Sequence, residues 1–532
     1  MRTIIRLVLL AVLLAPLPSR AEDLGLMRLS LAEGGVQVRL RDATDWTDAP
    51  VNLPLGEGDR LWAPEGSRTE LQVRGGVFVR TGAGTALDIL GMDGDAARFS
   101  LDRGHAYLGN RRGGIRTIQV DTPLVSVRSH DDSVLMIDTA EDGVTEVSVL
   151  KGSVDVESRS GAAAVSAGNT LTVRSGQDAE IALLDAPDAW ERWNTDRDRQ
   201  LSAWGESARH LPEELHDYSS DLDANGRWHS AGDHGYVWVP TVTAAAWAPY
   251  TMGRWVWIRG SYVWIADDTW CWTPCHYGRW IFLPAYGWSW VPPVPGSSSW
   301  GPGYVGWVVT PAYVAWVPLA PGEPYYGYGF YGPGSVNITT INVNTVALHR
   351  DLVNARHRHA VTVVKREHFG AGIREPYGVD ENPFLAGKRQ EAKNISIAPP
   401  PDRSDRPVLR VPPGIRDREQ PAGRVHQQEL PERRQAVPRT PPAVRAERPL
   451  VAPAVAHPGQ ARQLSPEQAV RTGPVGVKKE RRLVKERESA MLRARPPEEP
   501  AVKQRMEPKV INRQMPKQKP DQDEKKAERR RN

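Results

Sequence analysis

Two stretches of the chain share one pattern: Trp247-Ala-Pro-Tyr-Thr-Met-Gly-Arg-Trp255 and Trp272-Thr-Pro-Cys-His-Tyr-Gly-Arg-Trp280. Both read W-x-P-x-x-x-G-R-W, and a pattern this long rarely recurs by chance. It therefore indicates a repeated supersecondary unit. The repeat lies within residues 228–316, which hold 14 of the chain's 19 tryptophans. Tryptophan is large and costly to expose, so we expect the chain to be organised around this stretch.

Short aromatic runs recur through the same stretch. Aromatic residues two apart point to one face of a strand, and Gly and Pro fall between the runs. We predict an antiparallel meander with an aromatic face, closed by Gly-Arg-Trp turns, as a Trp-rich repeat domain over residues 225–334. The runs are Tyr236-Val-Trp238-Val-Pro240, Tyr262-Val-Trp264, Trp288-Ser-Trp290-Val-Pro292 and Tyr313-Val-Ala-Trp316-Val-Pro318.

The indoles have two interpretations. In the first they replace an aliphatic core. In the second some remain exposed in a groove and stack on the CH faces of sugars, since exposed apolar patches mark binding sites. The second interpretation makes Trp255, Trp280 and Trp290 ligand-stacking residues. Arg254 and Arg279 stand beside two of them, where a guanidinium can stack on an indole.

Cys271 and Cys275 are the only thiols in the sequence. Two cysteines are too few for a disulfide scaffold or a four-cysteine zinc site. The segment Cys271–His276 has one residue more than the haem-attachment motif C-x-x-C-H, so no cofactor is predicted. We expect a local disulfide if the protein is exported. A pair of reduced thiols is the alternative, because the loop is so small that strain can forbid the bond.

Residues 24–184 read as short strands punctuated by Gly and Asp. Alternation is clear in Gly35–Leu40, Thr69–Val73 and Thr145–Leu150. Strands of this length at such spacing predict an all-β sandwich or roll.

Several short motifs in this region resemble the FecR domain, a β-module of the bacterial periplasm. The resemblance implies the periplasmic fold. FecR proteins of the usual type also carry an anti-sigma segment and a transmembrane helix before the module. We find neither here, so sigma-factor regulation is not implied. The motifs are Trp46, Leu55-Gly-Glu-Gly-Asp-Arg-Leu61, Gly104-His-Ala-Tyr-Leu108, Val120-Asp-Thr-Pro123 and Val149-Leu-Lys-Gly-Ser-Val154.

The Trp-rich stretch carries a second resemblance. Its order of aromatic residues, ending in Val317-Pro-Leu-Ala-Pro321, resembles a Trp/Tyr-rich family of bacterial envelope proteins. In that family the domain follows a FecR-like module and precedes a low-complexity tail. The family has no established activity, so the resemblance implies architecture and location without chemistry.

Residues 1–21 read as a signal peptide. Arg2 and Arg6 precede the apolar run Leu7–Leu14, and Ser19 and Ala21 place small residues before a cleavage site. We therefore expect a protein exported to the periplasm or cell envelope.

A helical connector is predicted over residues 185–224, because Trp190, Trp193, Leu201 and Trp204 share one helical face. Residues 221–226 fit the first six positions of a calcium loop.

The twelfth calcium-loop position is Gly232 rather than Glu, so a turn opening the Trp-rich domain is the prediction and no metal is expected. Short strands and a loop follow over residues 335–397. His357 and His359, two residues apart there, are predicted to lie in a solvated turn rather than a metal site.

Residues 398–532 are predicted to be a disordered, Pro/Arg/Lys-rich basic tail. Residues 401–532 contain no Trp, Tyr or Phe, and they hold 20 of the 45 prolines. Such a segment buries too little apolar surface to offset its conformational entropy. It has 32 Lys and Arg against 18 Asp and Glu. Anionic lipid or an anionic polymer is the expected partner, and export argues against nucleic acid.

No catalytic motif was found in the sequence, so no catalytic residue is predicted. The leading prediction is an exported, non-catalytic binding or scaffolding protein of the cell envelope that contacts peptidoglycan or another glycan. One alternative is an envelope-state sensor, by analogy with FecR. Another is a glycan-processing enzyme using Asp267 and Asp268, although adjacent side chains of a strand point to opposite faces.

Overall fold

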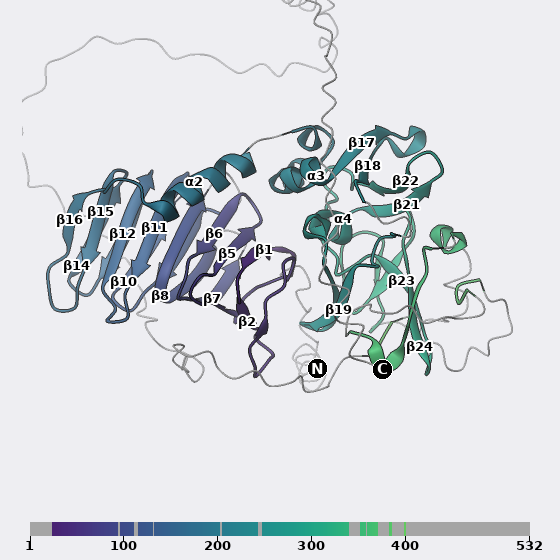
Figure 1. Cartoon of the computed structure of the whole chain (residues 1–532), viewed down its shortest axis with the longest axis horizontal. Helices are drawn as coiled ribbons and strands as arrows, with labels where there is room; N and C mark the ends of the chain where they lie inside the picture. Colours follow the sequence, from purple (N-terminus) through teal and green to yellow (C-terminus); the bar gives the residue numbers. More distant parts are fainter. Residues whose placement is uncertain are drawn as a thin grey trace, which may run out of the picture. The chain divides into compact units, whose positions relative to one another are not determined.

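The described part of the chain covers both predicted β-domains. The computed structural model describes residues 24–93, 96–110, 115–130, 132–202, 205–242, 247–339, 352–357, 359–370, 382–385 and 398–400 (Figure 1). The predicted signal peptide at 1–21 and tail residues 401–532 lie outside the described residues. No helix within the described ranges is long and apolar enough to cross a bilayer.

The N-terminal region consists of two sheets that share one long strand, β8 (Ala96–Asn110). All pairs are antiparallel except β8 with β9. The first sheet contains β1 (Met27–Glu33), β5 (Arg68–Val73), β6 (Val77–Thr81), β8, β11 (Ser133–Thr139), β12 (Thr145–Lys151), β15 (Asn169–Val173) and β16 (Glu180–Leu183). The second contains β3 (Thr47–Asp48), β2 (Gln37–Arg39), β4 (Arg60–Ala63), β7 (Thr85–Asp93), β8, β9 (Thr117–Asp121), β10 (Val125–Ser129), β13 (Ser153–Ser158) and β14 (Gly161–Ser166).

Strand β8 changes sheets at Gly104. Residues 96–103 pair with β7, whereas residues 104–110 pair with β11. Gly104 has a φ of +98°, and a Cβ atom there would lie 2.3 Å from Thr85 Oγ1. Only glycine adopts this backbone conformation at so close an approach. It thus lets one strand serve both sheets.

The core of this region is aliphatic and follows strand alternation. β11 alternates strictly between buried and half-buried positions, as does β9. Leu135 and Ile137 from the first sheet, and Ile118 and Val120 from the second, are at most 2% exposed. This pattern confirms the predicted all-β fold.

Helix α2 (Ala189–Ser202) lies along one face of the first sheet (Figure 1). Glu70 and Arg80, on β5 and β6, have fully buried side chains and form an ion pair of 2.7 Å. Arg197 of α2 binds Glu70 at 2.8 Å, and Asp198 of α2 binds Arg80 at 2.7 Å. Tyr107 on β8 donates a hydrogen bond of 2.8 Å to Asp198. The helix is therefore attached to the sheet by buried charges.

The connector contains more than the single predicted helix. A second helix, α3 (Ser219–Asn225), follows two 3₁₀ turns at Ser207–Arg209 and Glu213–Tyr218. On α2, the Trp190 and Trp193 rings stack with centroids 5.2 Å apart. Trp204 lies outside the described residues.

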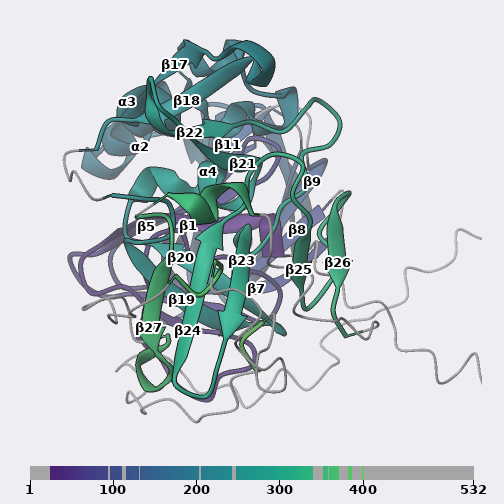
Figure 2. The ribbon, with the colours of Figure 1, turned by 90° about the vertical axis from the view of Figure 1, so that its right-hand side faces the viewer.

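The Trp-rich domain is built from four hairpins (Figure 2). Their strands match the aromatic runs, but they do not form one meander. β18 pairs with β22 and not with β19, so the first and third hairpins form one four-stranded sheet, and the second and fourth hairpins belong to two other sheets. The hairpins are β17 (Gly226–Ser230) with β18 (Tyr236–Pro240), β19 (Gly253–Ile258) with β20 (Ser261–Ala266), β21 (Arg279–Leu283) with β22 (Gly287–Val291), and β23 (Val305–Val309) with β24 (Tyr313–Pro318).

Among the described residues after the fourth hairpin there are three further strands. β27 (Thr362–Lys365) extends the fourth hairpin and lies where short strands were predicted, within residues 335–397. β25 (Tyr325–Gly327) pairs in parallel with β26 (Ser335–Asn337).

Candidate functional site

Every hairpin of the Trp-rich domain places two tryptophans directly opposite each other. Side chains at such positions contact across the strands, which stabilises the pair. The registers are Trp228 with Trp238, Trp255 with Trp264, Trp280 with Trp290, and Trp307 with Trp316.

The glycine of the Gly-Arg-Trp motif makes room for the indole on the second strand. A Cβ atom at Gly278 would lie 2.8 Å from Trp290, and one at Gly253 would lie 2.8 Å from Trp264. The same contact occurs at Gly226, where a Cβ atom would lie 2.3 Å from Trp238. Gly226-Arg-Trp228 is thus a third copy of the tripeptide. The prediction missed it because no W-x-P precedes it, although the tripeptide alone could have identified it.

The indoles form the core of this domain. Twelve of the fourteen tryptophans in residues 228–316 are buried, and Trp247 and Trp257 are half-buried. Trp255, Trp280 and Trp290 are 2%, 1% and 0% exposed. The ligand-stacking prediction for these three residues is therefore corrected, because none of them has an accessible ring face.

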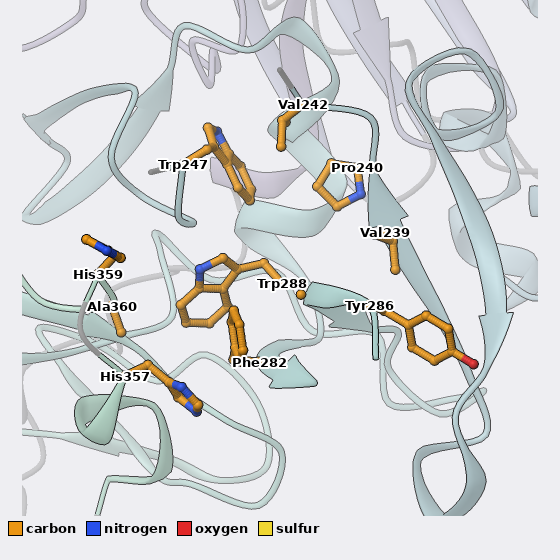
Figure 3. A pocket seen from close by; sticks show the side chains of 11 residues that line it. Val239, Pro240, Val242, Trp247, Phe282, Tyr286, Trp288, His357, His359 and Ala360 are labelled. Carbon is orange, nitrogen blue, oxygen red and sulfur yellow. The ribbon is translucent and has the colours of Figure 1, made fainter. Parts of the chain in front are cut away.

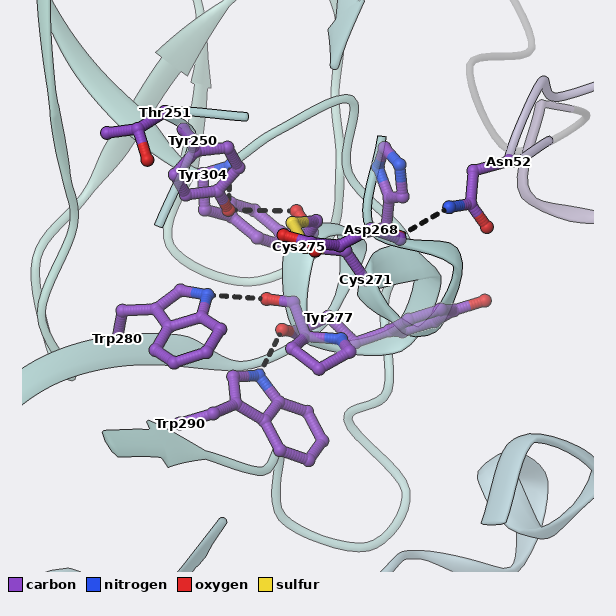
Figure 4. The surroundings of a disulfide bond; sticks show 12 residues. Asn52, Tyr250, Thr251, Asp268, Cys271, Cys275, Tyr277, Trp280, Trp290 and Tyr304 are labelled. Carbon is purple, nitrogen blue, oxygen red and sulfur yellow. Dashed lines mark hydrogen bonds between the residues drawn. A yellow bond between two sulfur atoms is a disulfide. The ribbon is translucent and has the colours of Figure 1, made fainter. Parts of the chain in front are cut away.

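The N–H groups of several of these indoles bind main-chain carbonyls between the strands. Trp280 donates to Pro274 at 2.8 Å, and Trp290 donates to Tyr277 at 2.8 Å (Figure 4). Trp316 donates to Tyr250 at 2.9 Å. The indoles thus fill the interior and satisfy buried carbonyls at the same time.

The arginines of the repeat do not stack on the neighbouring indoles. The Arg279 guanidinium lies 3.7 Å from the centroid of the Tyr304 ring. Consecutive side chains of a strand point to opposite faces, so Arg279 is directed away from Trp280. The same alternation separates half-buried Arg254 from Trp255 in the core. The prediction of Arg-on-Trp stacking is corrected accordingly.

Cys271 and Cys275 form a disulfide (Figure 4). The bond joins a 3₁₀ turn (Thr269–Cys271) to helix α4 (Trp272–His276), and both cysteines are buried. The Tyr250 hydroxyl donates to the Cys275 carbonyl at 2.8 Å. Tyr250 occupies the position of Cys275 in the other copy of the repeat, so the two copies pack against each other here.

The two adjacent carboxylates have different surroundings. Asp267 is exposed, whereas Asp268 is half-buried and accepts a hydrogen bond of 3.3 Å from the Trp247 indole. Burial raises the pKa of Asp268, and the neighbouring charge of Asp267 adds to this effect. A hydrolytic pair needs two carboxyl groups facing one bond, and these two differ in exposure and partners.

The segment that fits half of a calcium loop is helical. Asp221 in α3 forms an ion pair with Arg28, and Asp223 accepts a hydrogen bond of 2.8 Å from the Ser207 main-chain N–H. These carboxylates are used in helix packing. The turn predicted at this point is wrong, because α3 extends to Asn225.

A pocket of about 510 Å³ lies among the first and third hairpins and the turn before β27. Figure 3 shows the Trp247, Phe282 and Trp288 rings around one space, with His357 beside Phe282. The Phe282 ring is 4.5 Å from His357 and 5.7 Å from Trp288, between centroids. The described lining is Val239, Pro240, Val242, Trp247, Phe282, Tyr286, Gly287, Trp288, His357, His359 and Ala360.

The pocket gathers residues that are far apart in the sequence. Tyr286 is 38% exposed, so its ring is accessible at the pocket's edge, and it stacks on His229 at 4.7 Å. His357 and His359, predicted to lie in a solvated turn, both line the pocket. The described lining contains aromatic rings, imidazoles and aliphatic groups but no carboxylate. Within the described residues, no cluster of His, Cys, Asp or Glu could hold a metal ion.

Comparison with known proteins divides the chain in the same way. Residues 59–155 match the FecR protein family, and residues 219–323 match a family of unknown function, DUF6600. Two crystal structures of a candidate anti-sigma factor from Parabacteroides distasonis ATCC 8503, at 1.65 and 2.50 Å resolution, are similar at 18% identity and a TM-score of 0.22. The match covers 24% of this chain and 60% of that protein. No curated protein matches the chain.

Proposed function

Because the chain joins a FecR domain to a domain of the DUF6600 family, we propose that it is a non-catalytic binding or scaffolding protein of the bacterial cell envelope. Its aromatic pocket, rather than the paired tryptophans of the hairpins, holds the ligand. We further propose that this ligand is peptidoglycan or another envelope glycan.

The pocket is the observation that carries the proposal. Its volume of about 510 Å³ is within the usual range of ligand sites, roughly 300–1,000 Å³. The Trp247, Phe282 and Trp288 rings offer faces for the CH groups of a sugar. His357 and His359 supply the few polar groups that orient a ligand in such a pocket.

Three other features support a location in the envelope. The first 21 residues have the pattern of a signal peptide. The Cys271–Cys275 disulfide is typical of proteins in oxidising compartments. The basic composition of residues 401–532 suits contact with anionic lipid or polymer.

The FecR match favours a second candidate, an envelope-state sensor. A sensor must change conformation when the pocket is filled, whereas a scaffold need not. Hydrogen exchange of the FecR domain with and without ligand therefore distinguishes the two. Glycan processing is a weaker candidate, because glycosidases usually use two carboxyl groups and the described lining has none.

The test is binding of the full chain to peptidoglycan sacculi and to soluble muropeptides. Val242 is 37% exposed and lines the pocket, so Val242→Trp should fill it. We expect at least a tenfold loss of muropeptide affinity in calorimetric titrations, and unchanged binding in Val294→Trp. Val294 is 67% exposed and lies outside the pocket lining. Equal affinity in both variants, or no saturable binding by the native chain, would contradict the proposal.

A further inference from the structure

The first three residues of the predicted tail belong to the folded part of the chain. Ala398 is 3% exposed and Pro399 is also buried. The Tyr328 hydroxyl donates a hydrogen bond of 2.7 Å to the Pro399 carbonyl, and the Tyr262 hydroxyl donates one of 3.0 Å to the Pro400 carbonyl. These three residues, which the sequence analysis placed at the start of the tail, therefore contact the folded domain.

The two tyrosines that bind this segment belong to one aromatic surface, which we call the Tyr/Trp surface: Trp257, Tyr262 and Tyr328. Trp257 and Tyr262 lie directly opposite each other on β19 and β20, with centroids 4.9 Å apart. Tyr328 contacts Trp257 edge-on at 5.5 Å. Phe369 packs against Tyr262 at 5.0 Å. These contacts hold both tyrosine hydroxyls in place beside the segment.

The segment has the chemistry of a preorganised ligand. Ala398, Pro399 and Pro400 each precede a proline, which restricts all three to extended or polyproline II conformations. A polyproline II chain makes no internal hydrogen bonds, so its carbonyls are free to accept them. Here two consecutive carbonyls accept from two tyrosines. Aromatic surfaces in many proteins recognise proline-rich segments in this way.

We propose that the Tyr/Trp surface is a binding site for proline-rich peptides and that the chain's own Ala398–Pro400 segment occupies it. None of its three residues lines the glycan pocket, so this site is independent of the proposed function. A proline-rich peptide added in solution must compete with a tethered segment at high effective concentration. The native chain therefore binds such a peptide weakly until its own segment is released.

The experiment compares the full native chain with a full-length Pro399→Gly/Pro400→Gly variant. The probe is a fluorescent peptide with the sequence of residues 395–402, Ile-Ser-Ile-Ala-Pro-Pro-Pro-Asp. Glycine frees the backbone of the tethered segment and so weakens its docking. We expect the variant to bind the peptide about tenfold more tightly than the native chain, measured by fluorescence anisotropy. Equal affinity of the two proteins would overturn the proposal.

Matched substitutions distinguish a specific loss of peptide binding from a general change in folding. In the double-glycine background, Tyr328→Phe removes one hydroxyl and should weaken peptide binding about fivefold. Tyr236→Phe is the control, because Tyr236 is 52% exposed and stacks on His210. A peptide with alanine in place of its three prolines should bind at least tenfold more weakly. Equal binding of that peptide, or no effect of Tyr328→Phe, would refute proline recognition.

The last measurement shows whether the segment on the Tyr/Trp surface comes from the same chain or from a second copy. Sedimentation velocity of the native chain should give the same species at every concentration, as expected for a segment bound within its own chain. The opposite result would be a native chain that forms larger species as its concentration rises and a double-glycine variant that does not. It would show that the segment binds a second copy of the chain, and it would contradict binding within one chain.

Discussion

The two β-domains of this chain build their buried cores from different kinds of side chain. The FecR domain uses aliphatic residues from alternate positions of two sheets that share β8. The DUF6600 domain uses indoles from four small hairpins. In long sheets the strand ladders pair most carbonyls, so a core side chain needs no polar atom.

The hairpins of the DUF6600 domain leave irregular segments running through its interior. The carbonyls of Tyr250 and Tyr277 are in such segments, and those of Leu222 and Pro274 are in the short helices α3 and α4. Each of the four accepts a hydrogen bond from an indole. The side chains of leucine and valine have no hydrogen-bond donor. The difference teaches that tryptophan is used here for its N–H group as well as for its volume.

The strongest test of this contrast is in the FecR domain, where the buried polar element is ionic. Glu70→Gln removes the carboxylate that binds Arg80 and Arg197 beneath α2. We expect a loss of about 4 kcal/mol, because removing one partner of a buried ion pair leaves the other uncompensated. Urea unfolding measures it, with Glu33→Gln as the control. The Glu33–Arg68 pair is exposed, so that variant should change stability by less than about 0.5 kcal/mol.

The same carboxylate predicts a pH dependence. Burial alone would raise the pKa of Glu70, but hydrogen bonds and charges from Arg197 and Arg80 outweigh it and lower the pKa from 4.5 to about 2. A lowered pKa stabilises the fold fully above pH 4.5, and this contribution is lost as the pH falls toward 2. It amounts to about 3 kcal/mol. The stability gap between native protein and Glu70→Gln should narrow over that interval; a constant gap would contradict the assignment.

The next test asks whether the indole N–H matters beyond volume. Trp290→Phe loses both volume and the hydrogen bond to Tyr277, and should cost about 3 kcal/mol. Trp255→Phe is the matched control, because Trp255 is equally buried and its indole nitrogen has no hydrogen-bond partner among the described residues. It should cost about 1–2 kcal/mol less. Equal losses in guanidinium unfolding would reduce the indole's role to packing.

The smallest expected effect concerns the Cys271–Cys275 disulfide, which involves the second copy of the repeat and has no counterpart in the first. Cys271→Ala/Cys275→Ala opens a five-residue loop and should lower the free energy of unfolding by about 2 kcal/mol. Reducing the native protein should lower its stability similarly, while the reductant should leave the double variant unchanged. Identical unfolding curves for native and variant proteins would show that the bond contributes nothing.

Much of this architecture could be predicted from local patterns. Alternation in Thr145–Leu150 and the aromatic run Tyr236–Pro240 both identified strands, because the period of a strand is visible in its own sequence. The pairing of β18 with β22 could not be predicted this way. It depends on Trp238 meeting Trp290, two residues with no local signal of contact.

The candidate site was harder to predict for the same reason. A high density of tryptophan does not distinguish a core from a groove. Trp255, Trp280 and Trp290 were therefore predicted to be exposed, whereas they are buried. The pocket joins Trp247 to His357 across more than a hundred residues, and only the fold brings them together. The alternation of side chains along a strand, by contrast, would have been sufficient to predict that Arg279 points away from Trp280.

The opposed tryptophans also give the DUF6600 domain an optical property. Trp255 and Trp264 lie 5.2 Å apart at 60°, and Trp307 and Trp316 lie 5.7 Å apart at 58°. At such separations the electronic transitions of two indoles couple, and the coupling splits their circular dichroism band. The splitting vanishes when the strands separate. The closure of these hairpins can therefore be followed spectroscopically in the unlabelled protein, with its own chromophores as the reporter.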